Sequence, residues 1–158
     1  MRRHAVRSLG IAIILLTCTG AAQAQSVSPE AEIRAALEAW TADFNAGRTE
    51  KICDLFAPTL RADVRGAPER DFDTQCQLLR KALADPERSY IYAFALKEVV
   101  TERDMVRDIA VVRLTWTTTM RIKATGQVLT TFDEGLDVFG RGSNGAWRII
   151  RYMAYERP

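Results

Sequence analysis

The spacing of apolar residues changes once along this chain, near Tyr90, and that change limits the fold more than any other feature. Before Tyr90, apolar residues recur every three or four positions, as they do on one face of a helix. After it they alternate with polar residues, which is typical of half-buried strands. Helices followed by long strands predict an α+β domain, with the helices gathered on one face of an antiparallel sheet.

Three helices are expected before the strands. The first begins at Pro29, behind a serine that can cap its free amides. A second, short helix is expected within residues 49–58, and residues 59–70 are expected to form a polar loop. The third helix begins after Asp71 or Asp73, either of which can serve as its cap.

The alternating half of the chain divides into separate strands. Glycine-containing turns near Gly126 and Gly145 connect the last three of them. The expected strands are Tyr90–Leu96, Ile109–Ile122, Val128–Phe139 and Trp147–Tyr155.

Residues 1–24 have the layout of a secretory signal peptide, with a basic start, a short apolar stretch and a small-residue exit at Ala24. The apolar stretch is too short for a bilayer, which needs about 20 apolar residues. We therefore expect cleavage after Ala24, a periplasmic or secreted location, and a single domain over residues 25–158. In an alternative interpretation, Cys18 is a lipid-modified N-terminus.

Cleavage would remove the only histidine, His4, together with one of three cysteines. The mature chain then has no histidine base, no histidine-activated nucleophile and no imidazole metal ligand. It keeps 19 basic and 20 acidic residues and lacks the basic cluster that nucleic acids require. Its carboxylates do not have metal-ligand spacing, so no metal or other cofactor is expected.

Cys53 and Cys76 are the two cysteines that remain. An even pair in an oxidising compartment predicts a disulfide. The bond would close a loop of about 24 residues and stabilise the fold by roughly 3 kcal/mol. The alternative is two small buried thiols on helix faces.

Two motifs resemble the nuclear-transport-factor-2-like superfamily, which includes ketosteroid isomerases, scytalone dehydratase and the SnoaL polyketide cyclases. One runs from Trp40 through Asn-Ala-Gly47 into residues 52–58, and the other joins residues 136–139 to residues 145–150. The resemblance covers nearly the whole mature chain. It implies a cone-shaped, strongly curved antiparallel sheet with N-terminal helices on its concave face. That fold serves isomerases, dehydratases, binders and scaffolds, so it does not select a function.

In ketosteroid isomerases an aspartate moves the proton, while a tyrosine and a protonated aspartate donate hydrogen bonds to the developing enolate. The resemblance places the tyrosine position at Trp40, the base position at Val64 beside Asp63, and the protonated aspartate at Asp137. Valine cannot take a proton and tryptophan is a far weaker acid than a phenol, so that mechanism is disfavoured.

Asp137 is therefore the candidate catalytic acid, a carboxyl group with a raised pKa in an apolar pocket beside Trp40. In the simpler interpretation Asp137 faces solvent and the tryptophans are plain core. We expect replacement of Asp133 to have little effect, unless a bulge at residues 133–135 changes its facing. The candidate ligand-binding residues are Trp40, Asp63, Trp116, Asp137 and Tyr152.

Arginines flank the loop around Gly66. They are either contacts for an anionic ligand at the pocket mouth or a solvated loop surface. The three are Arg61, Arg65 and Arg70.

Three functions stay open. The first is an exported domain of SnoaL-like type that binds a small apolar or carbonyl-containing molecule. The second is a small isomerase or lyase, with Asp137 as the acid and Asp63 or another carboxylate as the base. The third is a homodimeric interaction module without a ligand. Two carboxylates on an apolar pocket favour the enzyme, one carboxyl group favours binding, and a filled core favours the module.

Both faces of the strand Val128–Phe139 carry apolar residues. If one face lines the pocket, the apolar residues of the other face would be exposed to solvent unless a second chain buried them. This predicts a homodimer through the outer side of the sheet. One face has Val128, Phe132, Leu136 and Val138, and the other has Leu129 and Phe139.

Overall fold

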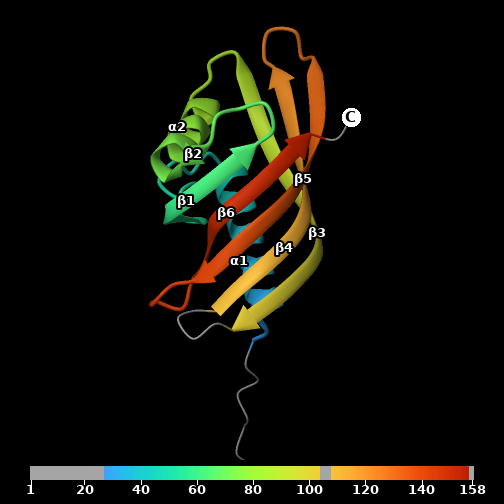
Figure 1. Cartoon of the computed structure of the whole chain (residues 1–158). Coiled ribbons are helices and arrows are strands. Elements are labelled where there is room, and N and C mark those ends of the chain that lie inside the picture. Colours follow the sequence, from blue (N-terminus) through green and yellow to red (C-terminus); the bar gives the residue numbers. More distant parts are fainter. Residues whose placement is uncertain (1–26, 104–107, 157–158) are drawn as a thin grey trace, which may run out of the picture.

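The computed structural model describes residues 27–103 and 108–156. The expected signal peptide at residues 1–24, with the alternative at Cys18, lies outside the described residues. No helix in the described part of the chain is long and apolar enough to cross a membrane. Two helices and a six-stranded sheet make up the domain, so the α+β class is confirmed (Figure 1).

Two of the three expected helices are present. In α1 (Pro29–Asn45), the Ser28 side chain caps the start by accepting from the Ala31 amide at 3.2 Å. In α2 (Phe72–Leu83), Asp71 accepts from the Thr74 amide at 2.9 Å. The residues that α1 buries are Ile33, Leu37, Trp40 and Phe44, spaced as one helical face.

The predicted short helix at residues 49–58 is wrong. Residues 49–55 form turns, and β1 (Phe56–Val64) occupies most of the expected loop. Pro58 does not break β1, because it lies where the pairing of β1 with β6 is irregular, between Phe56 and Arg61. At such a place its missing N–H costs the sheet no ladder bond. The two-residue strand β2 (Arg70–Asp71) then pairs with β1.

The remaining strands form an antiparallel series along one sheet, with β1 and β2 beyond β6. The sheet is mixed, because β1 pairs with β6 in parallel, and the expectation of a wholly antiparallel sheet is corrected. A long segment separates β1 from β6, so no hairpin dictates their relative direction. The strands are β3 (Arg88–Arg103), β4 (Asp108–Ile122), β5 (Val128–Arg141) and β6 (Trp147–Glu156), in the order β2-β1-β6-β5-β4-β3.

Helix α1 lies along one face of the sheet, called here the inner face, and α2 lies beside β1 and β2 (Figure 1). The buried side of α1 belongs to one apolar core with inner-face residues of the central strands. These include Ala110, Val112 and Leu114 of β4, Phe139 of β5 and Ile149 of β6.

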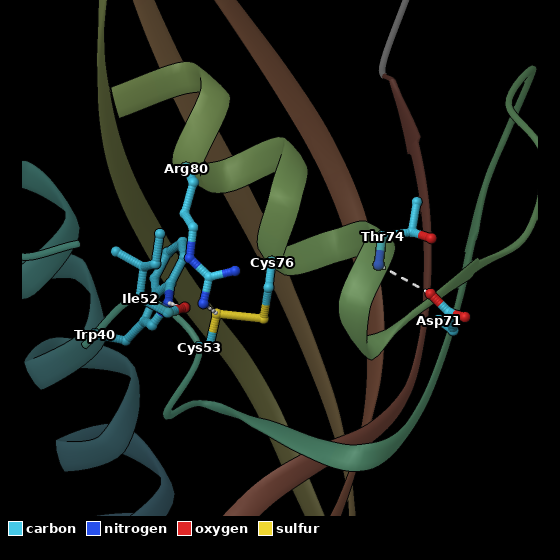
Figure 2. The surroundings of a disulfide bond; sticks show 7 residues. All are labelled: Trp40, Ile52, Cys53, Asp71, Thr74, Cys76 and Arg80. Atoms are coloured by element: carbon cyan, nitrogen blue, oxygen red, sulfur yellow. Dashed lines mark hydrogen bonds between the residues drawn. A yellow bond between two sulfur atoms is a disulfide. The ribbon is translucent and has the colours of Figure 1, made fainter. Parts of the chain in front are cut away.

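Cys53 and Cys76 lie at disulfide-bonding distance, as the sequence predicted, with Cα atoms 5.7 Å apart (Figure 2). That separation is normal for a disulfide. Cys76 belongs to α2 and Cys53 to the turns before β1, so the bond ties α2 to the segment that leads into the sheet. The Arg80 guanidinium lies 3.6 Å from the Cys53 sulfur.

Candidate functional site

A cavity of about 160 Å³ lies against the inner face, with walls from α1, α2 and the sheet. Most of its wall is apolar and includes the rings of Trp40 and Trp116. A smaller set of polar side chains also reaches it. These are Arg70, Gln75, Tyr92, Thr118, Asp133, Asp137 and Tyr152.

Strand alternation brings Asp137 into this cavity. The pairing of β5 with β4 is regular along residues 128–140, without a bulge. Asp133, Gly135 and Asp137 therefore share the inner face. Asp137 is only 2% exposed. The interpretation in which it faces solvent is therefore wrong.

The carboxyl group of Asp137 is only partly satisfied by the fold. Its Oδ2 atom is buried and has no hydrogen-bond partner among the described residues. Burial raises the pKa of Asp137 to about 7, because desolvation penalises the charged form, while the Trp116 side chain acts in the opposite direction. Near neutral pH the group therefore exchanges between a hydrogen-bond donor and a buried anion.

Tyr152 lies beside Asp137, on the neighbouring strand β6. Its hydroxyl donates to Oε1 of Gln75 at 2.9 Å, which connects the sheet to α2. Burial raises the pKa of Tyr152 to about 12, so the phenol stays protonated. The hydroxyl can therefore accept a further hydrogen bond but does not act as a base near neutral pH.

Trp40 lines the cavity with its ring and not with its donor. Its indole N–H donates to the Ile52 carbonyl at 2.7 Å (Figure 2). The ring packs edge-on against Trp116 and Tyr92, with centroids 5.4 and 5.5 Å apart. The Trp40 N–H therefore already has a partner within the fold, and the ring is what Trp40 offers a ligand.

Among the described residues, no group of histidine, cysteine and carboxylate side chains could hold a metal ion.

No family model matches the sequence, and neither does any curated protein. Solved structures do match. A ketosteroid isomerase-like protein from Erwinia carotovora atroseptica is 23% identical, with 81% of this chain and 95% of that chain covered and a TM-score of 0.64. A protein of unknown function from Shewanella oneidensis, described as similar to nuclear transport factor 2, is 17% identical, with 81% and 99% covered and a TM-score of 0.63.

A third similar structure, from Novosphingobium aromaticivorans, is described as nuclear-transport-factor-2-like with a cystatin-like fold. It is 18% identical, with 80% of each chain covered and a TM-score of 0.58. All three likenesses extend over about four fifths of this chain. The chain has the nuclear-transport-factor-2-like fold.

Within this nuclear-transport-factor-2-like domain, the positions carried over from the isomerases do meet. Trp40, Val64 and Asp137 all line the one cavity. Asp63, by contrast, is exposed on the other side of β1 and lines a separate surface hollow. The structure does not bring Asp63 together with Asp137, because neighbouring residues of a strand point to opposite faces.

Several cavity residues were not singled out from the sequence as ligand contacts. Asp133 could have been, because it lies four positions before Asp137 on one strand and the period of two puts both on the same face. Gln75 and Tyr92 carry no such signal. Arg70 was considered only as one of three loop arginines, and of these Arg70 alone lines this cavity.

Proposed function

We propose that this chain is an exported small-molecule-binding domain of SnoaL-like type. Its cavity takes a molecule about the size of one ring, and Asp137 in its protonated form donates a hydrogen bond to a carbonyl or similar acceptor. Residues 25–158 form this single domain, and its sheet and helices make the cone of the fold.

The observation that supports this proposal is the unpartnered Oδ2 of Asp137 at the cavity wall. A buried polar group without a partner costs stability, so most are satisfied within the fold. A ligand acceptor at this position would satisfy the protonated carboxyl group.

Cavity size restricts the ligand. An engineered cavity of about 150 Å³ in another protein accommodates benzene. The volume of about 160 Å³ here therefore suits a single ring and is too small for a four-ring steroid.

Calorimetric titration with acetophenone, a single-ring ketone, tests the proposal at about pH 5.5 and 8.5, on either side of the raised pKa of Asp137. We expect tighter binding at the lower pH, and no such pH dependence in Asp137→Asn, whose amide stays a neutral donor. The control Asp63→Asn removes a carboxylate outside the cavity and should keep the pH dependence. An acetophenone affinity that changes neither with pH nor on replacement of Asp137 would contradict the proposal.

Export is tested on the protein recovered from the cell envelope or medium. Intact mass should show a chain beginning at Gln25, with a mass increase of two hydrogen atoms on reduction of the Cys53–Cys76 bond. A chain that retains residues 1–24, or one that carries lipid on Cys18, would contradict cleavage after Ala24. Native mass spectrometry of the same sample would reveal any small molecule that co-purifies.

A small isomerase or lyase is the second candidate, favoured by the presence of Asp133 and Asp137 on the same cavity wall. The test substrate is 3-cyclohexen-1-one, whose double bond moves into conjugation when one carbon loses a proton and another gains one. Ultraviolet absorbance follows the conjugated product. If the domain is an enzyme, the wild type accelerates this reaction, and both Asp133→Asn and Asp137→Asn lower the rate.

A homodimer through the outer face of the sheet completes the proposal. The predicted facing of β5 agrees with the structure, since Phe132 is 45% exposed on the outer face while Phe139 is fully buried on the inner face. Other exposed apolar residues on the sheet are Ile91 of β3 and Met153 and Tyr155 of β6. Light scattering at micromolar concentration should give the mass of two chains, and Phe132→Glu should halve it.

A further inference from the structure

Sheet register aligns three polar cavity residues in one row across the inner face. Arg70 of β2 pairs with Ala62 of β1, Ala62 pairs with Tyr152 of β6, and Tyr152 pairs with Asp137 of β5. Strands lie about 4.8 Å apart, so roughly 14 Å of backbone separates the two ends of the row. Between the ends, Ala62 adds only a methyl group next to Arg70, and Tyr152 adds its phenol next to Asp137. The cavity therefore has an ionisable polar group at each end of the row, with the Tyr152 phenol beside Asp137.

The two ends of this row differ in burial and charge. Asp137 is 2% exposed and protonates near neutral pH, whereas Arg70 is half-buried and permanently charged. Within the described residues no carboxylate lies within ion-pairing distance of the Arg70 guanidinium, although five other arginines have such partners.

Most of the polar groups that share the cavity with Arg70 are neutral. Arg70 is a hydrogen-bond partner of the Tyr152 hydroxyl, and its charge also acts on Tyr92. Both phenols have a raised pKa and are neutral. Asp133 is the other charged side chain that lines the cavity, and it is not without an interaction of its own. Gln75 accepts from Tyr152 through Oε1, which leaves its amide N–H groups as further donors. The outer end of the cavity therefore offers hydrogen-bond donors and one positive charge.

We infer that the ligand of this cavity is a single-ring carboxylate, whose carboxylate group pairs with Arg70 and whose opposite polar group meets Asp137. Arginine suits this role because its planar fork binds a carboxylate through two parallel hydrogen bonds. The apolar ring of the ligand contacts the rings of Trp40 and Trp116 in the cavity wall. This inference rests on the proposed function and specifies its ligand class.

Calorimetric titration with 4-hydroxybenzoate and its neutral isostere 4-hydroxybenzamide, at about pH 6 where Asp137 is mostly protonated, tests the inference. We expect the wild type to bind the benzoate about tenfold or more tightly than the amide, since hydrogen bonds to charged groups contribute that much. Arg70→Gln should abolish this preference by weakening benzoate binding far more than amide binding, and Arg70→Lys should restore part of it. The control Arg61→Gln removes the same charge nearby, from an exposed arginine paired with Glu69, and should keep the preference.

The outcomes separate the inference from the proposed function. Equal affinity of the wild type for the two probes overturns the inference without requiring any variant to fold. If the amide still binds and loses affinity in Asp137→Leu, the proposed function stands. A preference for benzoate that survives in a folded Arg70→Gln also overturns the inference. If neither probe binds, both the inference and the proposed function are wrong for ligands of this size.

Discussion

The two ends of the inner face differ in how far their polar side chains are satisfied by hydrogen bonds within the fold. At the closed end, Glu32 of α1 accepts from Arg141 at 2.6 Å and from the Trp147 indole at 2.8 Å. Arg141 also donates to the Gly145 carbonyl at 3.0 Å and lies over the Trp147 ring. At the cavity end, Asp137 keeps one buried oxygen without a partner among the described residues. Arg141 and Asp137 are four residues apart on the same strand.

The polar groups at the closed end bind one another and stabilise the fold. The carboxyl group at the cavity end keeps an oxygen that a ligand can bind. The closed end fills its space with mutually satisfied side chains, which is the usual state of buried polar groups. The cavity end cannot be filled with such side chains, because they would occupy the cavity. It is held covalently instead. Cys76 follows Gln75, Cys53 precedes Leu55 by two residues, and both Gln75 and Leu55 line the cavity.

The largest expected effect is on the pH dependence of stability at the cavity end. The folded pKa of Asp137, about 7, lies above the ordinary value of 3.8 for an aspartate. Between these values the folded chain holds a proton that the unfolded chain has lost, so stability falls as pH rises. The stabilisation is complete below about pH 4 and is lost by about pH 7, with an upper limit of about 4 kcal/mol.

Urea unfolding of the wild type and Asp137→Asn across this pH range measures that effect. The free energy of unfolding of the wild type, relative to the variant, should decrease toward neutral pH. The charged and titratable cavity groups common to both proteins are Arg70, Tyr92, Asp133 and Tyr152, and they cancel in the comparison. A difference that stays constant with pH would mean that Asp137 titrates normally.

Removal of the disulfide should have the next largest effect and act mainly at the cavity end. Cys53→Ala with Cys76→Ala should lower the free energy of unfolding by about 3 kcal/mol, because the unfolded chain gains loop entropy. Amide hydrogen exchange should quicken in α2 before it does in α1. Equal acceleration in both helices would show that the bond does not act selectively on the cavity end.

The closed end is tested by Arg141→Met, which keeps an apolar side chain but leaves Glu32 without its cation. We expect a loss of about 2 kcal/mol, less than for a fully buried pair because both side chains are about one third exposed. Acetophenone binding should not change. The control Arg113→Met breaks the more exposed pair with Glu98 and should change stability by less than about 1 kcal/mol.

Much of this fold could be predicted from the sequence because its elements have strong local signals. The caps and apolar faces of α1 and α2 are complete in the sequence, and the four long strands alternate clearly. β1 was missed because Ile52, Leu55 and Phe56 have helical spacing and Pro58 resembles a stop. Short apolar runs do not distinguish the two periods. Its parallel pairing with β6 depends on contacts far apart in the sequence.

The candidate site was predicted only at the positions that local periodicity determines. The inward facing of Asp137 follows from alternation and from the resemblance. The bond between Trp40 and the Ile52 carbonyl depends on how the turns before β1 pack, and no sequence pattern shows that. The row that joins Arg70 to Asp137 depends on three strand registers, two of them with the missed β1. Asp63 was expected in the cavity because β1 was not recognised as a strand.

The smallest expected effect concerns Gly135, which lies between Asp133 and Asp137 on the cavity wall. A Cβ atom there would lie 3.2 Å from a methyl group of Leu114 and 3.5 Å from both Asp137 Oδ1 and the Trp116 ring. Leu114 is fully buried and has little room to move. Gly135→Ala should therefore cost about 1 kcal/mol through overpacking and weaken acetophenone binding several-fold.

The matched control at the closed end is Gly142→Ala, where a Cβ atom would meet only the exposed Asn144 side chain and a backbone carbonyl. It should change acetophenone affinity by less than about twofold, because no cavity contact is altered. Calorimetric titration of both variants, with urea unfolding of each, gives the comparison. If Gly135→Ala binds acetophenone as tightly as the wild type, the ligand does not reach the wall beside Asp137, and the assignment of that carboxyl group as the ligand's hydrogen-bond donor is wrong.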